Sequence, residues 1–228
     1  MRCDPTNGIP RLSLDGLRRS RSGSVAVEFA LIAPFMILLL LGAFDLSRYI
    51  NAQRRITLAS NSIAEILAQN GSGKITYKDI FAALDSTMIT FPAVLSDAKA
   101  KGMNWWGDVH VNMSSVLFTP TVPACTSNCT YTAKTAWSYG ANKRPCATQL
   151  TAAPDTNPPS PTSLPTSLFG PGSAIVVDIK YNYTPLVATK IFGTLPISKS
   201  FYIPPRYVPK VDYEFIWGDP LLVTPCPS

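Results

Sequence analysis

Residues Val25–Phe44, VAVEFALIAPFMILLLLGAF, decide how the rest of the chain is organised. These twenty residues contain one ionisable side chain, Glu28. As a helix rising about 1.5 Å per residue they would be about 30 Å long, the thickness of the hydrocarbon core of a bilayer. The stretch therefore predicts a single transmembrane helix. It is preceded by four arginines, Arg11, Arg18, Arg19 and Arg21.

The predicted helix continues beyond the apolar stretch. Apolar or small residues recur there at alternating steps of three and four, which is the pattern of a helix with one buried stripe. This stripe consists of Tyr49, Ala52, Ile56, Ala59, Ile63 and Ile66. No Pro or Gly interrupts it before Asn70-Gly71, which is a good C-terminal stop. We therefore expect one helix from about Ser24 to Gln69, apolar on all sides at first and amphipathic afterwards.

The start of this helix carries a recognisable motif. A basic leader is followed by Gly23, by the pair Glu28-Phe29 and by an apolar run that contains Pro34. This order resembles a type IV prepilin. More narrowly, the block from Arg21 to about Ala64 is similar to the TadE-like minor pilins of the Flp/Tad pilus system. The resemblance covers about a fifth of the chain and is specific because all these features occur together.

The resemblance implies roles for four residues. A prepilin peptidase would cut after Gly23, where the missing side chain lets the backbone lie close to the enzyme, and Ser24 would become the first residue. Glu28 and Phe29 would act in subunit assembly, with the Glu28 carboxylate paired to the N-terminal amine of a neighbouring subunit. An ionised carboxylate in hydrocarbon costs at least a few kcal/mol, which favours such a pairing. The alternative is a hydrated Glu28 at the bilayer interface, where it complements the helix dipole.

Charge and cysteines indicate the compartment. The net charge is +6, of which residues 1–23 hold half. Nothing in residues 24–228 favours nucleic-acid binding.

The cysteines indicate an oxidising compartment. Cys3 falls in the leader, which leaves an even set of four: Cys125, Cys129, Cys146 and Cys226. Of the three possible pairings we favour Cys125–Cys129, a short local loop, with Cys146–Cys226. A metal site is the weaker interpretation, because the only histidine is His110.

The orientation follows from the flanking charges only weakly, because basic residues stand on both sides of the apolar stretch. The cysteines and the resemblance favour a cytoplasmic N-terminus and a periplasmic C-terminal part in a single-pass protein of the bacterial inner membrane. A secretory signal peptide cleaved near Ala43 is a competing interpretation. The apolar run is longer than usual for a signal peptide, and no clear cleavage site precedes Ala43.

Residues 70–228 predict an α+β domain with an antiparallel sheet. After a polar hinge, Thr76 and Asp79 predict the start of a helix with Ile80, Phe81, Leu84 and Met88 on its apolar face, bounded by Pro92. A short helical stretch at 93–101 follows. Alternation then predicts strands at 107–118, 131–139, 174–183 and 197–203. His110 would be exposed, Trp105-Trp106 would pack in the core or an interface, and Tyr213, Phe215 and Trp217 would lie on an edge strand.

Residues 151–172, the Pro-rich segment, contain six prolines and many Ser and Thr residues. Such a run forms neither helix nor inner strand, so we expect it to be extended or mobile. We expect it to be an insertion without a task, rather than a partner-binding loop.

These patterns predict a structural protein and not an enzyme, because no catalytic or cofactor-binding motif occurs. We expect three regions: a leader (1–23), a membrane and amphipathic helix (24–69) and a periplasmic domain (70–228). As a minor pilin the protein would act in pilus assembly or initiation and hence in adhesion. The resemblance implies as partners the prepilin peptidase, major and minor pilins, the inner-membrane assembly platform and the lipid bilayer. The alternative is an uncleaved membrane-anchored periplasmic adaptor.

Overall fold

The structure, a computed structural model, describes residues 21–146, 148–187, 189–220 and 223–226. The chain divides into one unit that ends at Ser47 and a second that begins at Arg48. Helix α2 (Arg21–Ala68) contributes to both units. The second unit combines helices with an antiparallel sheet, so the predicted α+β class is confirmed. The predicted division at residues 23 and 69 stays a prediction, and the leader up to residue 20, with Cys3, lies outside the described residues.

The part of α2 in the second unit buries one stripe of side chains. Ala52, Ile56, Ala59 and Ile63 are each at most 7% exposed, as the heptad pattern predicts. Ile66 was expected to continue the stripe, but it is 39% exposed, and Leu67 is buried instead. An α-helix has 3.6 residues per turn, so a stripe on a straight helix drifts away from a strict seven-residue repeat. That drift moves the contact from position 66 to position 67.

Helices α3, α4 and α5 lie between α2 and the main sheet in sequence. Helix α3 (Tyr77–Thr90) begins with a capping box, in which the Thr76 backbone N–H donates to Asp79 Oδ2 at 2.7 Å. Pro92 follows its end, and α4 (Ala93–Ala100) and the short α5 (Trp105–Asp108) come next. The two helices predicted after α2 and before residue 102 are confirmed. Helix α5 was not predicted, and its residues 107 and 108 were wrongly assigned to a strand, which begins only at Val109. The apolar face of α3 differs from the prediction, because Phe81 is 41% exposed and Ala83 takes its place in the core.

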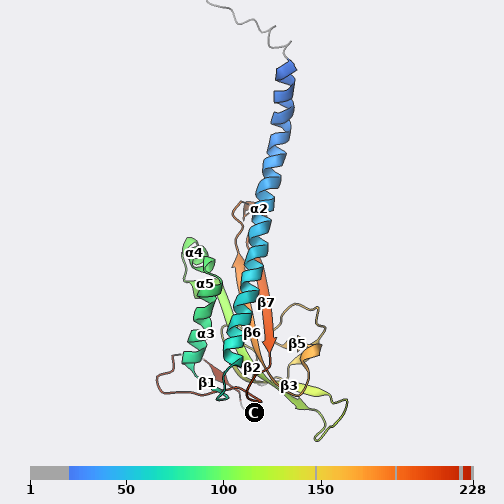
Figure 1. The fold of residues 1–228 in the computed structure, drawn as a ribbon, viewed down its shortest axis with the longest axis vertical. Coiled ribbons are helices and arrows are strands. Elements are labelled where there is room, and N and C mark those ends of the chain that lie inside the picture. Colours follow the sequence, from blue (N-terminus) through green and yellow to red (C-terminus); the bar gives the residue numbers. More distant parts are fainter. Residues whose placement is uncertain (1–20, 147, 188, 221–222, 227–228) are drawn as a thin grey trace, which may run out of the picture. The chain divides into compact units, whose positions relative to one another are not determined.

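One antiparallel sheet forms the centre of the second unit (Figure 1). Among the described residues its strands lie in the order β7-β6-β2-β3-β9. Their bounds are β2 (Val109–Pro120), β3 (Tyr131–Tyr139), β6 (Gly172–Tyr183), β7 (Leu195–Ile203) and β9 (Thr224–Pro225). The short helix α6 (Thr189–Phe192) lies between β6 and β7 in sequence. The first four strands occur close to where alternation predicts them.

The main core lies between one face of this sheet and the helices α2 and α3. Ile56 and Ile63 from α2 belong to the same buried cluster as Ile80 from α3 and Met113 and Val177 from the sheet. Met113 and Val177 are register partners on β2 and β6. The second half of α2 is therefore a structural element of the sheet domain.

The predicted edge strand near the C-terminus is wrong in most of its length. Only Asp212–Tyr213 forms a strand, β8, which pairs in parallel with β1 (Lys74–Ile75). Phe215 and Trp217 are 71% and 98% exposed. The edge of the main sheet is β9 instead, which is paired with Trp137 and Ser138 of β3. Tyr213 pairs with Ile75, but the alternation at Phe215 and Trp217 belongs to no strand among the described residues.

The Pro-rich segment is more ordered than the sequence predicts. β4 (Thr151–Ala153) and β5 (Ser163–Pro165) pair in parallel, and the 3-10 turn η1 (Thr166–Leu168) follows. Leu164 is buried in a second apolar cluster on the other face of the sheet, with Val116, Phe118 and Val176. A composition rich in Pro excluded helix, as expected. It did not exclude burial of the few apolar residues that the segment contains.

Candidate functional site

The N-terminal part of α2 presents apolar side chains all around the helix. From residue 25 to residue 40 the large apolar side chains are exposed by 55% at Ile37 to 71% at Phe29 and Leu39. Among the described residues, this is the one helix long and apolar enough to cross a membrane by itself, with a mean hydropathy of 2.4 in its most apolar window. A continuous apolar surface of this kind is stable in a bilayer or against other proteins, and not in water.

The predicted cleavage residues, Gly23 and Ser24, and the predicted assembly residues, Glu28 and Phe29, lie in this part of the chain. Gly23 and Ser24 have helical backbone, since α2 already begins at Arg21. Glu28 lies on the helix five positions after Gly23 and is exposed, and the neighbouring Phe29 is exposed as well. The one acidic side chain of the apolar stretch is therefore held at a fixed distance along the helix from the predicted cleavage position.

The structure places the two predicted cysteine pairs at disulfide distance. Cys125 and Cys129 have Cα atoms 5.8 Å apart and lie in the connection between β2 and β3. Cys146 and Cys226 have Cα atoms 5.0 Å apart, although 80 positions separate them in sequence. Beside this second pair, the Cys226 backbone N–H donates to the Ala136 carbonyl of β3 at 2.8 Å. The pair thus fastens the C-terminal strand to the edge of the sheet.

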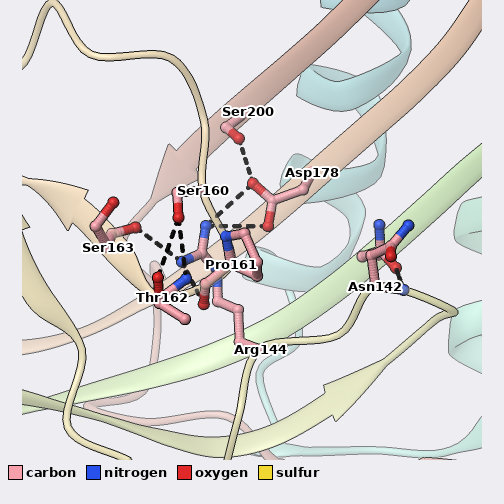
Figure 2. Close-up of polar contacts among 9 residues, drawn as sticks. Asn142, Arg144, Ser160, Pro161, Thr162, Ser163, Asp178 and Ser200 are labelled. Carbon is pink, nitrogen blue, oxygen red and sulfur yellow. Dashed lines mark hydrogen bonds and ion pairs between the residues drawn. The ribbon is translucent and has the colours of Figure 1, made fainter.

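A charged cluster lies between the Pro-rich segment and the sheet (Figure 2). The Arg144 side chain is 1% exposed, and its Nη2 lies 3.0 Å from Asp178 Oδ2 on β6. Its Nη1 donates to the Ser163 carbonyl at 3.0 Å, while the Ser200 hydroxyl donates to Asp178 Oδ1. The cluster joins β6, β7 and the Pro-rich segment. These contacts hold the segment in place, since both terminal nitrogens of the guanidinium, Nη1 and Nη2, contact protein acceptors.

A cavity of about 460 Å³ lies between α3, α5 and the ends of β2 and β3. His110 lines this cavity and is half-buried, so its predicted exposed position is wrong. The helical turn of α5 delivers Trp105 and Trp106 to the same cavity, where Trp105 is half-buried and Trp106 is 62% exposed. Sequence reasoning missed this site because it combines residues from four elements. The Trp105-Trp106 pair was its one visible signal.

In the described part of the chain, no group of three or more His, Cys, Asp or Glu side chains is arranged to hold a metal ion. Burial raises the pKa of Tyr139 above its usual value, beside the cavity.

The comparison with known protein families assigns the first part of α2. Residues 23–65 match the family described as TadE-like protein. The N-terminal helix is TadE-like. The match begins at Gly23 and contains Glu28 and Phe29, as well as most of the buried stripe of α2. No curated protein and no solved structure matches the chain.

The TadE-like segment, residues 23–65, therefore joins both units of the structure. Its first half is the exposed apolar helix, and its second half belongs to the core of the sheet domain. The TadE-like pilin family is structural and not enzymatic, and its known setting is the Flp/Tad pilus. The first part of α2 is thus a TadE-like segment that is long and apolar enough to cross a membrane.

Proposed function

We propose that this protein is a structural minor pilin of a Tad/Flp pilus. The observation that carries the proposal is the coincidence of the TadE-like match with the exposed apolar helix of residues 25–44. This helix crosses the bacterial inner membrane once, with the N-terminus in the cytoplasm and the sheet domain in the periplasm. The two cysteine pairs support this orientation, because disulfides form in oxidising compartments.

The prepilin peptidase removes residues 1–23 at the cytoplasmic face of the membrane. Gly23 suits this reaction for two reasons. It leaves room for the enzyme, and it destabilises the first turn of α2 by up to about 1 kcal/mol relative to alanine. Because Gly23 lies in a helix, that turn has to open before the peptide bond is cut.

Glu28 guides the mature subunit into the pilus. Cleavage produces a cationic amine on Ser24, about one helical turn from Glu28 in sequence. In hydrocarbon, the Glu28 carboxylate of one subunit and the Ser24 amine of its neighbour neutralise each other, which removes the cost of burying either charge alone. The exposed Phe29 packs beside this pair against the neighbouring helix.

Incorporation requires further partners. Major and minor pilins supply the surfaces that cover the apolar helix once it leaves the bilayer, and the inner-membrane assembly platform performs the transfer. The minor pilin acts in pilus assembly or initiation and, through the pilus, in adhesion of cells to surfaces.

The experiment compares Gly23→Leu with Gly42→Leu in cells that make the pilus. Nothing lies within 4 Å of a Cβ added at Gly42, so the second variant controls for a leucine in the same helix. We expect the mature protein to begin at Ser24 by mass spectrometry, and Gly23→Leu to retain the leader and to be missing from sheared pili. A native protein that begins at Met1, or pili that contain Gly23→Leu normally, would contradict the proposal.

A second candidate is an uncleaved, membrane-anchored periplasmic adaptor. The helical backbone around Gly23 favours it, because proteases cut extended segments. The same mass measurement separates the two functions, since an adaptor keeps its leader and stays in the membrane fraction.

A further inference from the structure

The cavity between α3, α5 and the ends of β2 and β3 has the size of a ligand site and no assigned role. Its volume of about 460 Å³ lies in the range of small-molecule pockets, ~300–1,000 Å³. It lies wholly in the second unit, on the side of the sheet where Figure 1 shows α3 and α5. Its lining is mainly apolar and aromatic, with a few polar groups, as is usual for binding sites.

Aromatic rings form the walls of this cavity. The rings of Trp105 and Trp106 have centroids 5.9 Å apart and planes inclined at 72°, so they form a corner. Phe81 and Tyr139 are also part of the lining. Phe81 and Trp106 keep 41% and 62% of their surface exposed, which a ligand would reduce. Because the face of an aromatic ring is negative, a corner of rings attracts a cation.

The charges of the cavity also favour a cation. Among the described lining residues Asp85 is the one carboxylate, and none is Lys or Arg. Asp85 is exposed at the rim and is therefore accessible to a ligand. The ammonium of Lys101 is engaged elsewhere in the same unit, with Asp108 at 2.5 Å and over the ring of Tyr181. The cavity thus offers aromatic rings and one carboxylate to a cation, and the ammonium of Lys101 does not occupy it.

We propose that this cavity binds a quaternary ammonium group of the choline type, either free or as a phosphocholine headgroup. Trp106, Trp105 and Tyr139 surround the methyl groups, and Asp85 balances the charge. A trimethylammonium group fits the wide, apolar cavity better than a primary ammonium, which is more strongly hydrated and smaller. Aromatic surroundings with a nearby carboxylate are the usual way in which proteins recognise quaternary ammonium ions.

The test uses the full-length protein in maltoside micelles, which contain no quaternary ammonium. Choline is titrated by calorimetry against its uncharged isostere, 3,3-dimethyl-1-butanol. We expect choline to bind about tenfold more tightly than the isostere, because the shape is shared and only the charge differs. Equal binding of the two compounds would overturn the proposal. So would the absence of choline binding at about 100 mM, which is about 100 times a millimolar Kd.

Variants locate the site. Asp85→Asn and Trp106→Ala both replace exposed residues, so we expect each to fold and to weaken choline binding about tenfold. Trp217→Ala is the matched control, because this indole is 98% exposed and does not line the cavity. An effect of Trp217→Ala equal to that of Trp106→Ala would place the binding elsewhere and overturn the proposal.

A second titration identifies the source of the group. Glycerophosphocholine is compared with choline on the same protein. Tighter binding of glycerophosphocholine assigns the site to lipid headgroups, and tighter binding of choline assigns it to a free solute. Choline binding is independent of cleavage at Gly23. A failure of the choline-binding proposal is therefore distinguishable from a failure of the proposed pilin function.

Discussion

The guanidinium of Arg144 lies 3.0 Å from the carboxylate of Asp178, with the arginine almost completely removed from solvent. The same guanidinium holds the Ser163 carbonyl of the Pro-rich segment. An ion pair that is also hydrogen-bonded to the backbone fixes the position of the whole segment. The position of the Pro-rich segment therefore depends on Arg144 and Asp178, which lie outside it. The composition of the segment itself does not reveal these contacts.

Asp178→Ala should destabilise the sheet domain strongly. It leaves the Arg144 charge buried without its partner, and breaking a buried pair on one side costs about 3–5 kcal/mol. The midpoint of urea unfolding should fall accordingly. Lys74→Ala is the control, because the Lys74–Glu214 pair is exposed at both ends and such pairs contribute about 0–1 kcal/mol. Similar midpoints for the two variants would show that the Arg144 pair does not hold the segment.

The ordered structure of the Pro-rich segment could not be predicted from the sequence. Prolines and the absence of periodicity correctly excluded helix and inner strand. The residues that hold the segment, Arg144 and Asp178, stand outside it, and nothing in their local sequence links them. By contrast, α2 and strands β2, β3, β6 and β7 were predicted close to their positions, because a helix or strand with one buried face repeats its apolar residues at a fixed period.

Gly140→Ala should also be strongly destabilising. Gly140 has φ +114°, and a Cβ there would lie 2.4 Å from Asn112 Oδ1 and 2.7 Å from the Val111 carbonyl. The strained backbone alone costs about 1–3 kcal/mol, and the contact with the backbone adds to it. Gly71→Ala meets no atom within 4 Å and should be nearly neutral. Thermal unfolding of both variants at one scan rate checks the difference.

The two disulfides should contribute unequally to stability. Cys146–Cys226 closes a connection of 80 positions, and the chain-entropy model assigns about 4.5 kcal/mol to a loop of that size. Cys125–Cys129 spans 4 positions, for which the same model gives about 2 kcal/mol. Cys146→Ser/Cys226→Ser should therefore lower the free energy of unfolding more than Cys125→Ser/Cys129→Ser. Guanidinium unfolding of the two double variants measures both losses in the free energy of unfolding. A larger loss for Cys125→Ser/Cys129→Ser would contradict the model.

Tyr181 should make the sheet domain less stable in alkali. Burial and the hydrogen bond to the Asp97 carboxylate raise the pKa of Tyr181 well above its ordinary value of 10.0. The unfolded chain loses this proton near pH 10, while the folded state keeps it. The contribution of Tyr181 is therefore complete below pH 10 and is lost as the pH rises above it, at up to about 1.4 kcal/mol per pH unit.

Tyr181→Phe removes this dependence. The variant should be less stable than the wild type at pH 7, by about 1 kcal/mol for the lost hydrogen bond. Its stability should then decline less steeply between pH 10 and 12. Urea unfolding at several pH values measures both slopes. Identical slopes would mean that other groups, among them Tyr213 with its raised pKa, account for the alkaline loss.

The proposed pairing of Glu28 makes a prediction that separates assembly from folding. Glu28→Gln keeps the shape of the side chain but removes the charge, so the Ser24 amine of a neighbouring subunit has nothing to neutralise it. The variant should still enter the membrane, since a neutral amide is less costly there than a carboxylate. Cleavage after Gly23 should persist, and the amount of protein in sheared pili should fall at least about tenfold, the effect of losing roughly 1.4 kcal/mol of subunit affinity.

Glu65→Gln is the matched control, because it removes a carboxylate from the same helix. Glu65 pairs with Arg206 at 3.3 Å, with both side chains partly exposed, and such pairs contribute little. Equal loss of both variants from pili would show that the total charge of α2 matters and not the position of Glu28. Normal incorporation of Glu28→Gln would instead favour a hydrated carboxylate at the membrane interface, where the helix dipole and not a neighbouring amine stabilises it.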